Sequence, residues 1–327
     1  MGLYDVFGKD IGMYVTPEMY GAVGDGIADD TNAVRSAVNK GGLVLLNGKY
    51  RCTSTISISQ SDTFIDGVGT IIGDFSSSGS VLAIWITDSS IRNHIRIKNI
   101  SIRSSETGTH NGIIYRKEAS GDDIFTDVLI DGVNIDGVTG NGIHLHGGSI
   151  NSDTARLYFN ILNCHIQNVG GIGICESHVS SRIQKCFISE SALENITVDN
   201  GCYRTVISDN ILINHNGGAG NISVDECESC IVANNQIINH ILSDFNSDYN
   251  CGINANCNTG DVSGFIVIGN VIKNGKYGVR LGNISSGYKG GGIFTNNMFD
   301  SVSASSIYQI NTSVCVIDNN IPATTQN

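Results

Sequence analysis

Apolar residues recur along the chain in pairs separated by one polar or small residue, and the pairs repeat at a regular interval. Two copies are nearly identical, Glu194-Asn-Ile-Thr-Val-Asp199 and Gly220-Asn-Ile-Ser-Val-Asp225. Because side chains alternate between the faces of a strand, both apolar residues of a pair lie on one face. The first members form a column of Ile113, Ile143, Ile172, Ile196, Ile222, Ile253, Val279 and Ile307. The second members form a column of Tyr115, Leu145, Ile174, Val198, Val224, Ala255, Leu281 and Gln309.

The interval between pairs, roughly 24 to 31 residues, is typical of stacked repeat units. A second pattern, Val/Ile-x-x-Asn-x-x-Ile, falls between the pairs. It predicts a column of Asn99, Asn163, Asn210, Asn235, Asn270, Asn297 and Asn320, in which Gly132 and Lys185 fill the two remaining rungs. Amide side chains at one bend of stacked coils are close enough to hydrogen-bond along the stack. Two apolar columns and an Asn column predict an all-β fold, a single-stranded right-handed parallel β-helix.

The N-terminal segment predicts a cap on this solenoid. Residues 1–15 are expected to be a lead-in, and residues 16–327 one β-helix domain that begins with a cap at about residues 16–42. Asp29, Asp30 and Thr31 are suited to the start of a short helix, whose first backbone amides lack partners. The apolar stripe of this helix is Ala33, Val34, Ala37 and Val38. We expect the helix to cover the open end of the coils, where strand edges are unpaired.

The segment before this helix, with Gly24, Asp25, Gly26, Asp29, Asp30 and Thr31, resembles the opening of pectate-lyase-like β-helix proteins, especially phage tailspikes and polysaccharide depolymerases. The resemblance implies a glycan substrate and a homotrimer. It does not extend to the catalytic motifs of polygalacturonases, because Arg96-Ile-Lys98 comes too early and the other motifs are missing.

Charge and hydropathy exclude several partners. The net charge of -12 disfavours nucleic acids and anionic membrane surfaces. No apolar run approaches the roughly 20 residues needed to cross a bilayer. The N-terminus has no signal-peptide pattern, while the family resemblance favours an extracellular or virion-associated location. The ten cysteines are not spaced in pairs, and we expect them to be mostly reduced core residues such as Cys164 and Cys186.

The strand residues that alternate with the apolar residues of each pair face outward. They form a strip that contains the candidate catalytic and binding residues. Asp199 and Asp225 occupy one outward column on successive coils, about 4.8 Å apart. Close carboxyl groups raise one another's pKa, which suits a pair in which one acid is protonated and the other ionised. Separations of about 5 to 5.5 Å belong to retaining glycosidases and about 6.5 to 9.5 Å to inverting ones. The same-column pair fits the first range, and a diagonal pair, Asp199 with Glu226 or Glu176 with Asp225, fits the second.

We therefore expect Asp199 and Asp225 to be catalytic. The other outward or loop residues of this region are predicted to bind substrate: His144, His146, Glu176, Glu226, Asn254, Arg280, Phe245 and Tyr249. Phe245 and Tyr249 belong to a long insertion, residues 239–250, which we expect to border a groove. The alternative, structural interpretation is a solvated polar strip with no catalytic role.

These features predict an enzyme that cleaves glycosidic bonds of a poly- or oligosaccharide, a glycoside hydrolase or transglycosidase that uses paired carboxylates. Three alternatives remain: a polysaccharide lyase acting by β-elimination, a cyclising enzyme similar to fructan transferases, and a non-catalytic glycan-binding or virion-structural β-helix. No metal or other cofactor is expected for a hydrolase, whereas a lyase would make Ca²⁺ an option.

Overall fold

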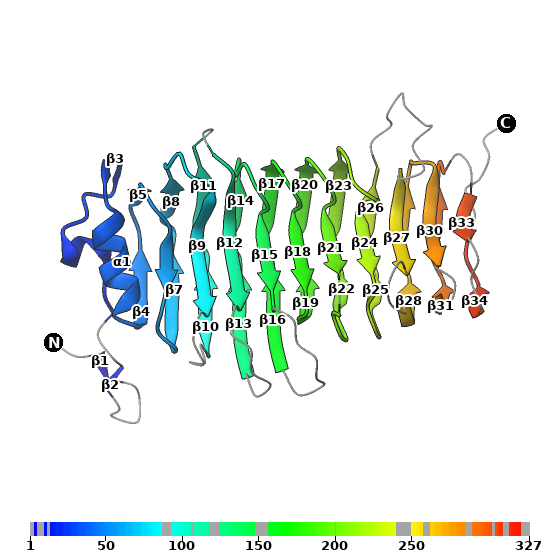
Figure 1. Cartoon of the computed structure of the whole chain (residues 1–327), viewed down its shortest axis with the longest axis horizontal. Helices are drawn as coiled ribbons and strands as arrows, with labels where there is room; N and C mark the ends of the chain where they lie inside the picture. Colours follow the sequence, from blue (N-terminus) through cyan, green and yellow to red (C-terminus); the bar gives the residue numbers. More distant parts are fainter. Residues whose placement is uncertain are drawn as a thin grey trace.

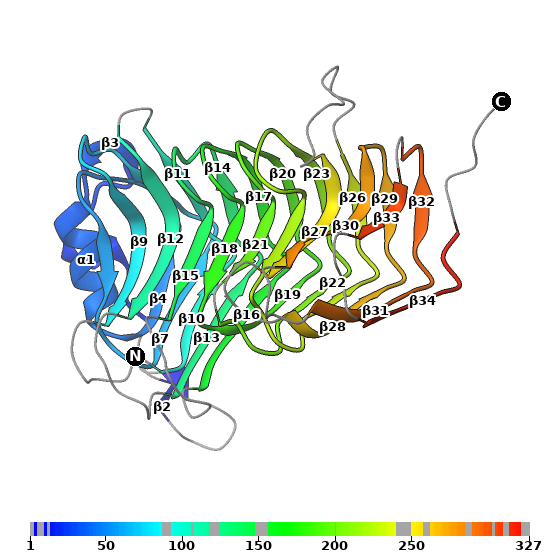
Figure 2. The same ribbon diagram turned by 45° about the vertical axis from the view of Figure 1, so that its right-hand side comes forward.

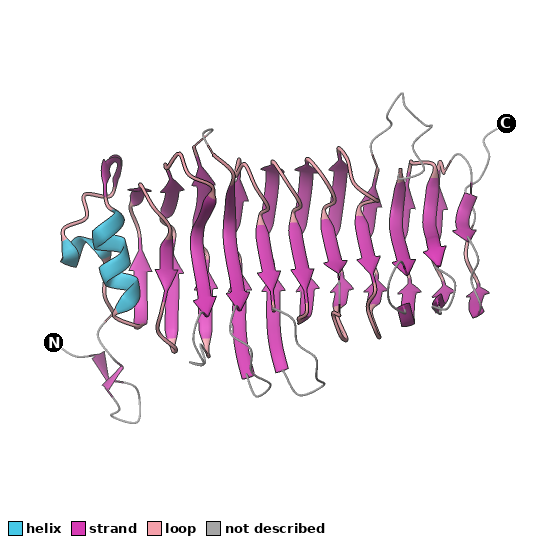
Figure 3. Cartoon of the chain, viewed as in Figure 1, coloured by secondary structure: helices cyan, strands magenta, loops and turns pink. Residues whose placement is uncertain are grey.

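The structure is a computed structural model that describes residues 3–4, 10–11, 14–86, 93–105, 108–117, 125–147, 156–199, 201–239, 250–257, 262–284, 290–302, 305–309 and 314–321. It is a right-handed parallel β-helix, as the sequence predicts. Successive coils stack along one axis (Figure 1), and the single described α-helix lies at the N-terminal end (Figure 3). Each regular coil contributes one strand to each of three long parallel sheets, which we call sheets 1, 2 and 3.

Sheet 1 crosses the front of Figure 1 and contains the strands of the apolar pairs. Its strands are β6 (Ile56–Ile58), β9 (Gly79–Ile86), β12 (His110–Lys117), β15 (Ile143–His146), β18 (Ile174–Ser177), β21 (Ile196–Asp199), β24 (Ile222–Asp225), β27 (Cys251–Cys257), β30 (Tyr277–Ile284) and β33 (Ser305–Gln309).

Sheets 2 and 3 complete the wall of the solenoid (Figure 2). Sheet 2 contains β4 (Gly42–Leu46), β7 (Thr63–Gly67), β10 (Ile95–Lys98), β13 (Phe125–Asp131), β16 (Arg156–Leu162), β19 (Ser180–Gln184), β22 (Val206–Ser208), β25 (Ile231–Ala233), β28 (Val262–Ile268), β31 (Gly290–Thr295) and β34 (Val314–Asp318). Sheet 3 contains β3 (Asp25–Asp29), β5 (Lys49–Cys52), β8 (Thr70–Gly73), β11 (Ser101–Ser104), β14 (Asn134–Asp136), β17 (His165–Val169), β20 (Phe187–Ser191), β23 (Ile211–His215), β26 (Gln236–Ile238), β29 (Val271–Lys273) and β32 (Met298–Asp300).

Helix α1 (Thr31–Asn39) covers the N-terminal end of the solenoid and buries Val34, Ala37 and Val38 against the first coil. The expected helix start is only partly as predicted. Asp29 accepts a hydrogen bond from the backbone N–H of Thr31, whereas Asp30 accepts from the backbone of the preceding loop instead of from the helix. A 3-10 helix, η1 (Pro17–Tyr20), precedes the cap, and β1 (Leu3–Tyr4) pairs antiparallel with β2 (Asp10–Ile11).

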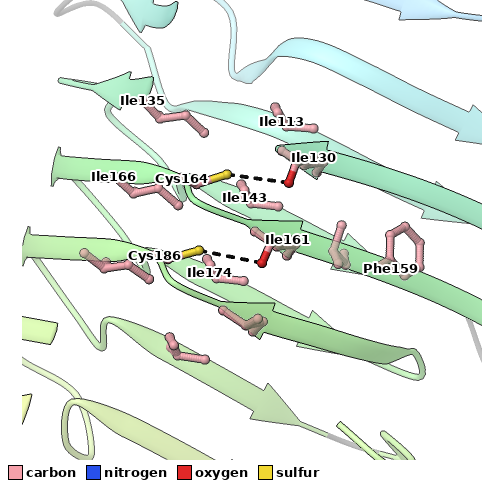
Figure 4. Close-up of a cluster of buried hydrophobic side chains, with 14 of the residues drawn as sticks. Ile113, Ile130, Ile135, Ile143, Phe159, Ile161, Cys164, Ile166, Ile174 and Cys186 are labelled. Atoms are coloured by element: carbon pink, nitrogen blue, oxygen red, sulfur yellow. Dashed lines mark hydrogen bonds between the residues drawn. The ribbon is translucent and has the colours of Figure 1, made fainter. Parts of the chain in front are cut away.

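Stacked aliphatic side chains fill the interior of the coils (Figure 4). The first inward column of sheet 1 follows the sequence prediction except in one coil, where Ile174, and not Ile172, pairs with Ile143 and Ile196. The segment Gly171-Ile-Gly-Ile174 offers two Gly-Ile steps two residues apart. Because a shift by two residues preserves the face of every side chain, alternation by itself does not distinguish them.

The predicted Asn column is two adjacent columns. Buried Asn210, Asn235, Asn270 and Asn297 form a ladder that ends at Asn320, each amide donating to the next Oδ1 at 2.9–3.0 Å. The earlier members lie one position before this column, in the left-handed region that Asn and Gly tolerate: Asn99, Gly132, Asn163 and Lys185.

In the earlier coils the interior corner position belongs to apolar residues and then to thiols. Cys164 and Cys186 occupy it on successive coils, and their Sγ atoms donate to the carbonyl groups of Ile130 and Ile161 (Figure 4). Backbone amides continue the column, since the N–H of Cys186 donates to Oδ1 of Asn210. Both thiols are free and buried, as expected for reduced core residues. In the parts of the chain that the structure describes, no helix has the length and apolar character needed to cross a membrane.

Candidate functional site

The outward side of sheet 1 carries two polar columns in the central and C-terminal coils. Backbone register defines both columns, because paired residues of parallel neighbours face the same way. The first runs through Ile114, His144, Cys175, Thr197, Ser223, Asn254 and Arg280. The second runs through Arg116, His146, Ser177 and Asp199 and continues on the next coil through Asp225, Asn256 and Gly282.

Glu176 does not belong to this outward strip, so its predicted placement is wrong. It pairs with Leu145 and Val198, which are core residues, and its side chain is fully buried. The two-residue shift at Ile174 is the cause, because the strand then includes Glu176 as its second inward residue, whereas the predicted register left Glu176 in the turn after the strand. The diagonal pair of Glu176 with Asp225 is excluded for the same reason, and Glu176 is not placed to contact a substrate.

Asp225 ends β24 and is only partly accessible. The Ser223 Oγ donates to its Oδ2 at 3.0 Å, and the side chain of Asn256 also hydrogen-bonds the carboxyl group. Burial, together with the charges of Asp199 and Glu194, raises the pKa of Asp225 to about 6 against the effect of these hydrogen bonds. Asp225 is therefore an acid that holds its proton to higher pH than an exposed aspartate.

Asp199 ends the neighbouring strand β21, in the equivalent place. The register Val198↔Val224 precedes the two aspartates by one residue, so their backbones are about 4.8 Å apart. The structure thus places Asp199 and Asp225 at equivalent positions of adjacent coils, as the sequence predicts.

Glu194 is a third carboxylate near this pair, and it is not among the residues predicted from the sequence. It lies in the turn before β21, where its Oε1 accepts a hydrogen bond from the backbone N–H of Ala219 at 2.7 Å. Its charge raises the pKa of Asp225. Comparison of the two repeat copies could have identified this residue, because Glu194 occupies the position at which the second copy has Gly220.

Three histidines lie on the N-terminal side of the carboxylates. His146 contacts Ser177, with Nδ1 and Oγ 2.7 Å apart, and its ring lies 6.4 Å from that of His144 and 6.1 Å from that of His178. Burial lowers the pKa of all three imidazoles, and the charge of Arg116 lowers those of His144 and His146 further. His144 and His146 share the outward face with Asp199, as predicted from alternation.

On the C-terminal side, Asn254 and Arg280 lie in the first outward column but are almost closed to solvent, at 0 % and 8 % exposed. Arg280 Nη1 donates to Oδ1 of Asn254 at 2.8 Å and to Oδ1 of Asn256 at 3.4 Å. The amide of Asn254 in turn lies 3.5 Å from the Oγ of Ser223. These residues form a hydrogen-bonded network beside Asp225.

Three further residues are predicted to bind substrate: Glu226, Phe245 and Tyr249. Glu226 follows Asp225 in the turn after β24, with a left-handed backbone (φ 55°). Phe245 and Tyr249 lie outside the described residues. Among the residues that the structure does describe, no three His, Cys, Asp or Glu side chains are arranged to hold a metal ion.

No protein-family model matches the chain. It is 29% identical over 201 residues to a capsule-specific depolymerase of Klebsiella phage K64-1, and 26% identical over 232 residues to one of Klebsiella phage KN3-1. These alignments cover 56% and 58% of this chain but only 25% and 27% of the relatives. The chain therefore spans about a quarter of the curated relatives that it matches.

Among solved structures, the fold is similar to full-length tailspike protein 2 from Escherichia coli O157:H7 bacteriophage CAB120. The TM-score is 0.71, over 98% of this chain and 44% of the tailspike, and the sequence identity is 14%. This likeness supports the fold of the chain, a parallel β-helix.

Proposed function

We propose that this chain is the glycan-cleaving β-helix of a polysaccharide depolymerase and that Asp199 and Asp225 form its catalytic pair. The observation that carries the proposal is the placement of the two aspartates at equivalent ends of adjacent strands, with the pKa of Asp225 raised to about 6. The two phage relatives, which are capsule-specific depolymerases, support a bacterial capsular polysaccharide as the substrate class.

In this mechanism Asp225 is the general acid. Its proton passes to the glycosidic oxygen as the bond from that oxygen to the anomeric carbon breaks, so the departing sugar leaves as an alcohol. The Asp199 carboxylate then has one of two roles. It either attacks the anomeric carbon, giving a glycosyl ester that water or an acceptor hydroxyl later cleaves, or it removes a proton from an attacking water.

A strand spacing of about 4.8 Å favours the first role, since retaining enzymes keep their carboxyl groups about 5 to 5.5 Å apart. The charge of Glu194 assists catalysis with either role of Asp199. By raising the pKa of Asp225 it keeps more of the general acid protonated near neutral pH.

A panel of neutral and acidic capsular polysaccharides tests this proposal. We expect shortened, saturated products from the wild-type protein and at least a hundredfold loss of rate in Asp199→Asn and Asp225→Asn. Asp209→Asn is the matched control, because Asp209 is exposed on the same coil as Asp199 and its left-handed backbone suits asparagine. Ultraviolet-absorbing unsaturated products would indicate a lyase instead. Binding without cleavage of any glycan would indicate a non-catalytic β-helix.

We also propose that the chain assembles as a homotrimer, and an apolar column on the outside of sheet 2 supports self-association. Val206, Ile231, Ile266 and Ile293 follow one another on four successive coils, and Ile293 is 44% exposed. Exposed apolar surface of this kind is typical of contact sites. Light scattering of the wild-type protein should give three times the chain mass, and Ile231→Glu/Ile293→Glu should give the monomer.

A further inference from the structure

Arg280 is nearly buried, so it has little access to a ligand, and it hydrogen-bonds two neighbouring side chains. It belongs to β30, directly beside Asn254 of β27, and only 8% of it is exposed. Through Nη1 it reaches the side-chain oxygens of both Asn254 and Asn256, which lie two residues apart on the outward face of that strand. A buried arginine that spans two asparagines fixes both of them at once.

The direction of these hydrogen bonds follows from the chemistry of the groups. A guanidinium group has N–H donors and no acceptor, so each asparagine must turn its Oδ1 toward Arg280. The Nδ2 of each amide then faces the preceding coil, at β24. Since Nδ2 carries N–H groups, it can only donate hydrogen bonds to that coil. Without the arginine, either end of an asparagine amide could face that coil.

Both amides act on the same carboxyl group. Asn256 hydrogen-bonds Asp225 directly, and Asn254 lies 3.5 Å from the Ser223 Oγ, which donates to Asp225 Oδ2 at 3.0 Å. The donors oppose the effects of burial and of the neighbouring carboxylates on the pKa of Asp225. Two routes therefore lead from Arg280 to Asp225, one through each asparagine.

We propose that Arg280 is a positioning residue, which orients the amides of Asn254 and Asn256 so that their donors hold the Asp225 carboxyl group in place. The catalytic meaning of this role rests on the proposed function, in which Asp225 is the general acid. The hydrogen-bond relay itself does not depend on that function. It replaces the expectation that Arg280 contacts the substrate.

Carbon-13 NMR titration of the Asp225 carboxyl group tests the relay without any substrate. In Arg280→Met, which keeps the bulk and removes the donors, we expect the pKa of Asp225 to rise by about half a unit to one unit, the worth of one hydrogen bond. Arg182→Met, an exposed arginine of sheet 2, is the matched control and should leave this titration unchanged. An Asp225 that titrates as in the wild type in folded Arg280→Met would overturn the proposal.

A second variant keeps the test decisive if Arg280→Met does not fold. Asn256→Leu removes one link and leaves the arginine, so it should raise the pKa of Asp225 in the same direction; no change would refute the relay. Where all variants fold, the shift in Arg280→Met/Asn256→Leu should be smaller than the sum of the two single shifts, because both act on one path. Full additivity would show that Arg280 acts on Asp225 independently of Asn256. A protein that shows the shifts but cleaves no glycan would retain the relay and lose the proposed function.

Discussion

Ser181 donates a hydrogen bond from Oγ to Oε2 of Glu176 at 2.7 Å, and both side chains lie buried inside the solenoid. A carboxylate in such a place is costly unless it is paired, and the usual outcome is that the group keeps its proton. Burial raises the pKa of Glu176 to about 7, although the hydrogen bond from Ser181 and the nearby Thr205 hydroxyl group oppose the rise. The interior of the coil thus contains an acid that ionises near neutral pH.

Replacing Glu176 with Gln should therefore stabilise the protein in alkaline solution. Because its pKa is higher in the folded state than its ordinary value of 4.5, the group contributes stability below pH 4.5 that is lost as pH rises through about 7. Glu176→Gln should match the wild type at pH 4 and gain up to about 3 kcal/mol at pH 8. Thermal unfolding at both pH values measures this. The exposed Glu228→Gln is the control, and equal pH dependence in Glu176→Gln and the wild type would contradict the prediction.

The rate of glycan cleavage should depend on the protonation of Asp225. With a raised pKa of about 6, kcat/KM should fall as pH increases through 6, since the general acid loses its proton there. Removing the charge of Glu194 in Glu194→Gln should lower this pKa and move the falling limb to lower pH. Profiles of kcat/KM against pH for both proteins decide the matter. Glu190→Gln, on sheet 3, should keep the wild-type profile, and a Glu194→Gln limb that stays at pH 6 would exclude this electrostatic role.

The histidine cluster should respond to Arg116 in a selective way. The charge of Arg116 lowers the pKa of His144 and of His146, whereas the pKa of His178 is lowered by burial and by the charge of His146. Arg116→Gln should raise the pKa of His144 and His146 and leave that of His178 nearly unchanged. NMR titration of the imidazole protons measures all three in one sample, so His178 is the internal control. Equal shifts of all three would mean that the substitution altered the fold of the strip.

The interior Asn ladder should be a large source of stability. Asn270 donates to the side chain of Asn297 and accepts from the backbone and side chain of Asn235. Asn270→Ala leaves buried donors without partners, which costs about 1 to 3 kcal/mol for each group. We expect a total loss of about 2 to 4 kcal/mol in the free energy of unfolding. Asn320→Ala, at the less buried end of the ladder, should cost less in the same denaturant titration, and equal losses would argue against burial as the cause.

The residue pattern by itself determined the fold, because a β-helix repeats one local rule in every coil. The columns through Ile113, Ile143 and Ile196 follow from alternation, and so does the shared outward face of Asp199 and Asp225. Each depends only on neighbours in the chain and on a fixed interval. The cap helix is likewise local, since its apolar stripe and its polar start lie within a few residues.

Register between coils was decided only by the tertiary structure. Alternation has a period of two, so it could not tell Ile172 from Ile174, and the choice moved Glu176 from the turn after the strand to the second inward position of the strand. The two Asn columns were merged for a different reason, because Asn163 in a left-handed turn and Asn210 in the interior differ by one position at a bend, where strand alternation does not apply. The role of Arg280 was equally hidden, since a hydrogen bond to Asn254 depends on which coils pack together and how deeply. Stacking fixes those distances, and no local pattern encodes them.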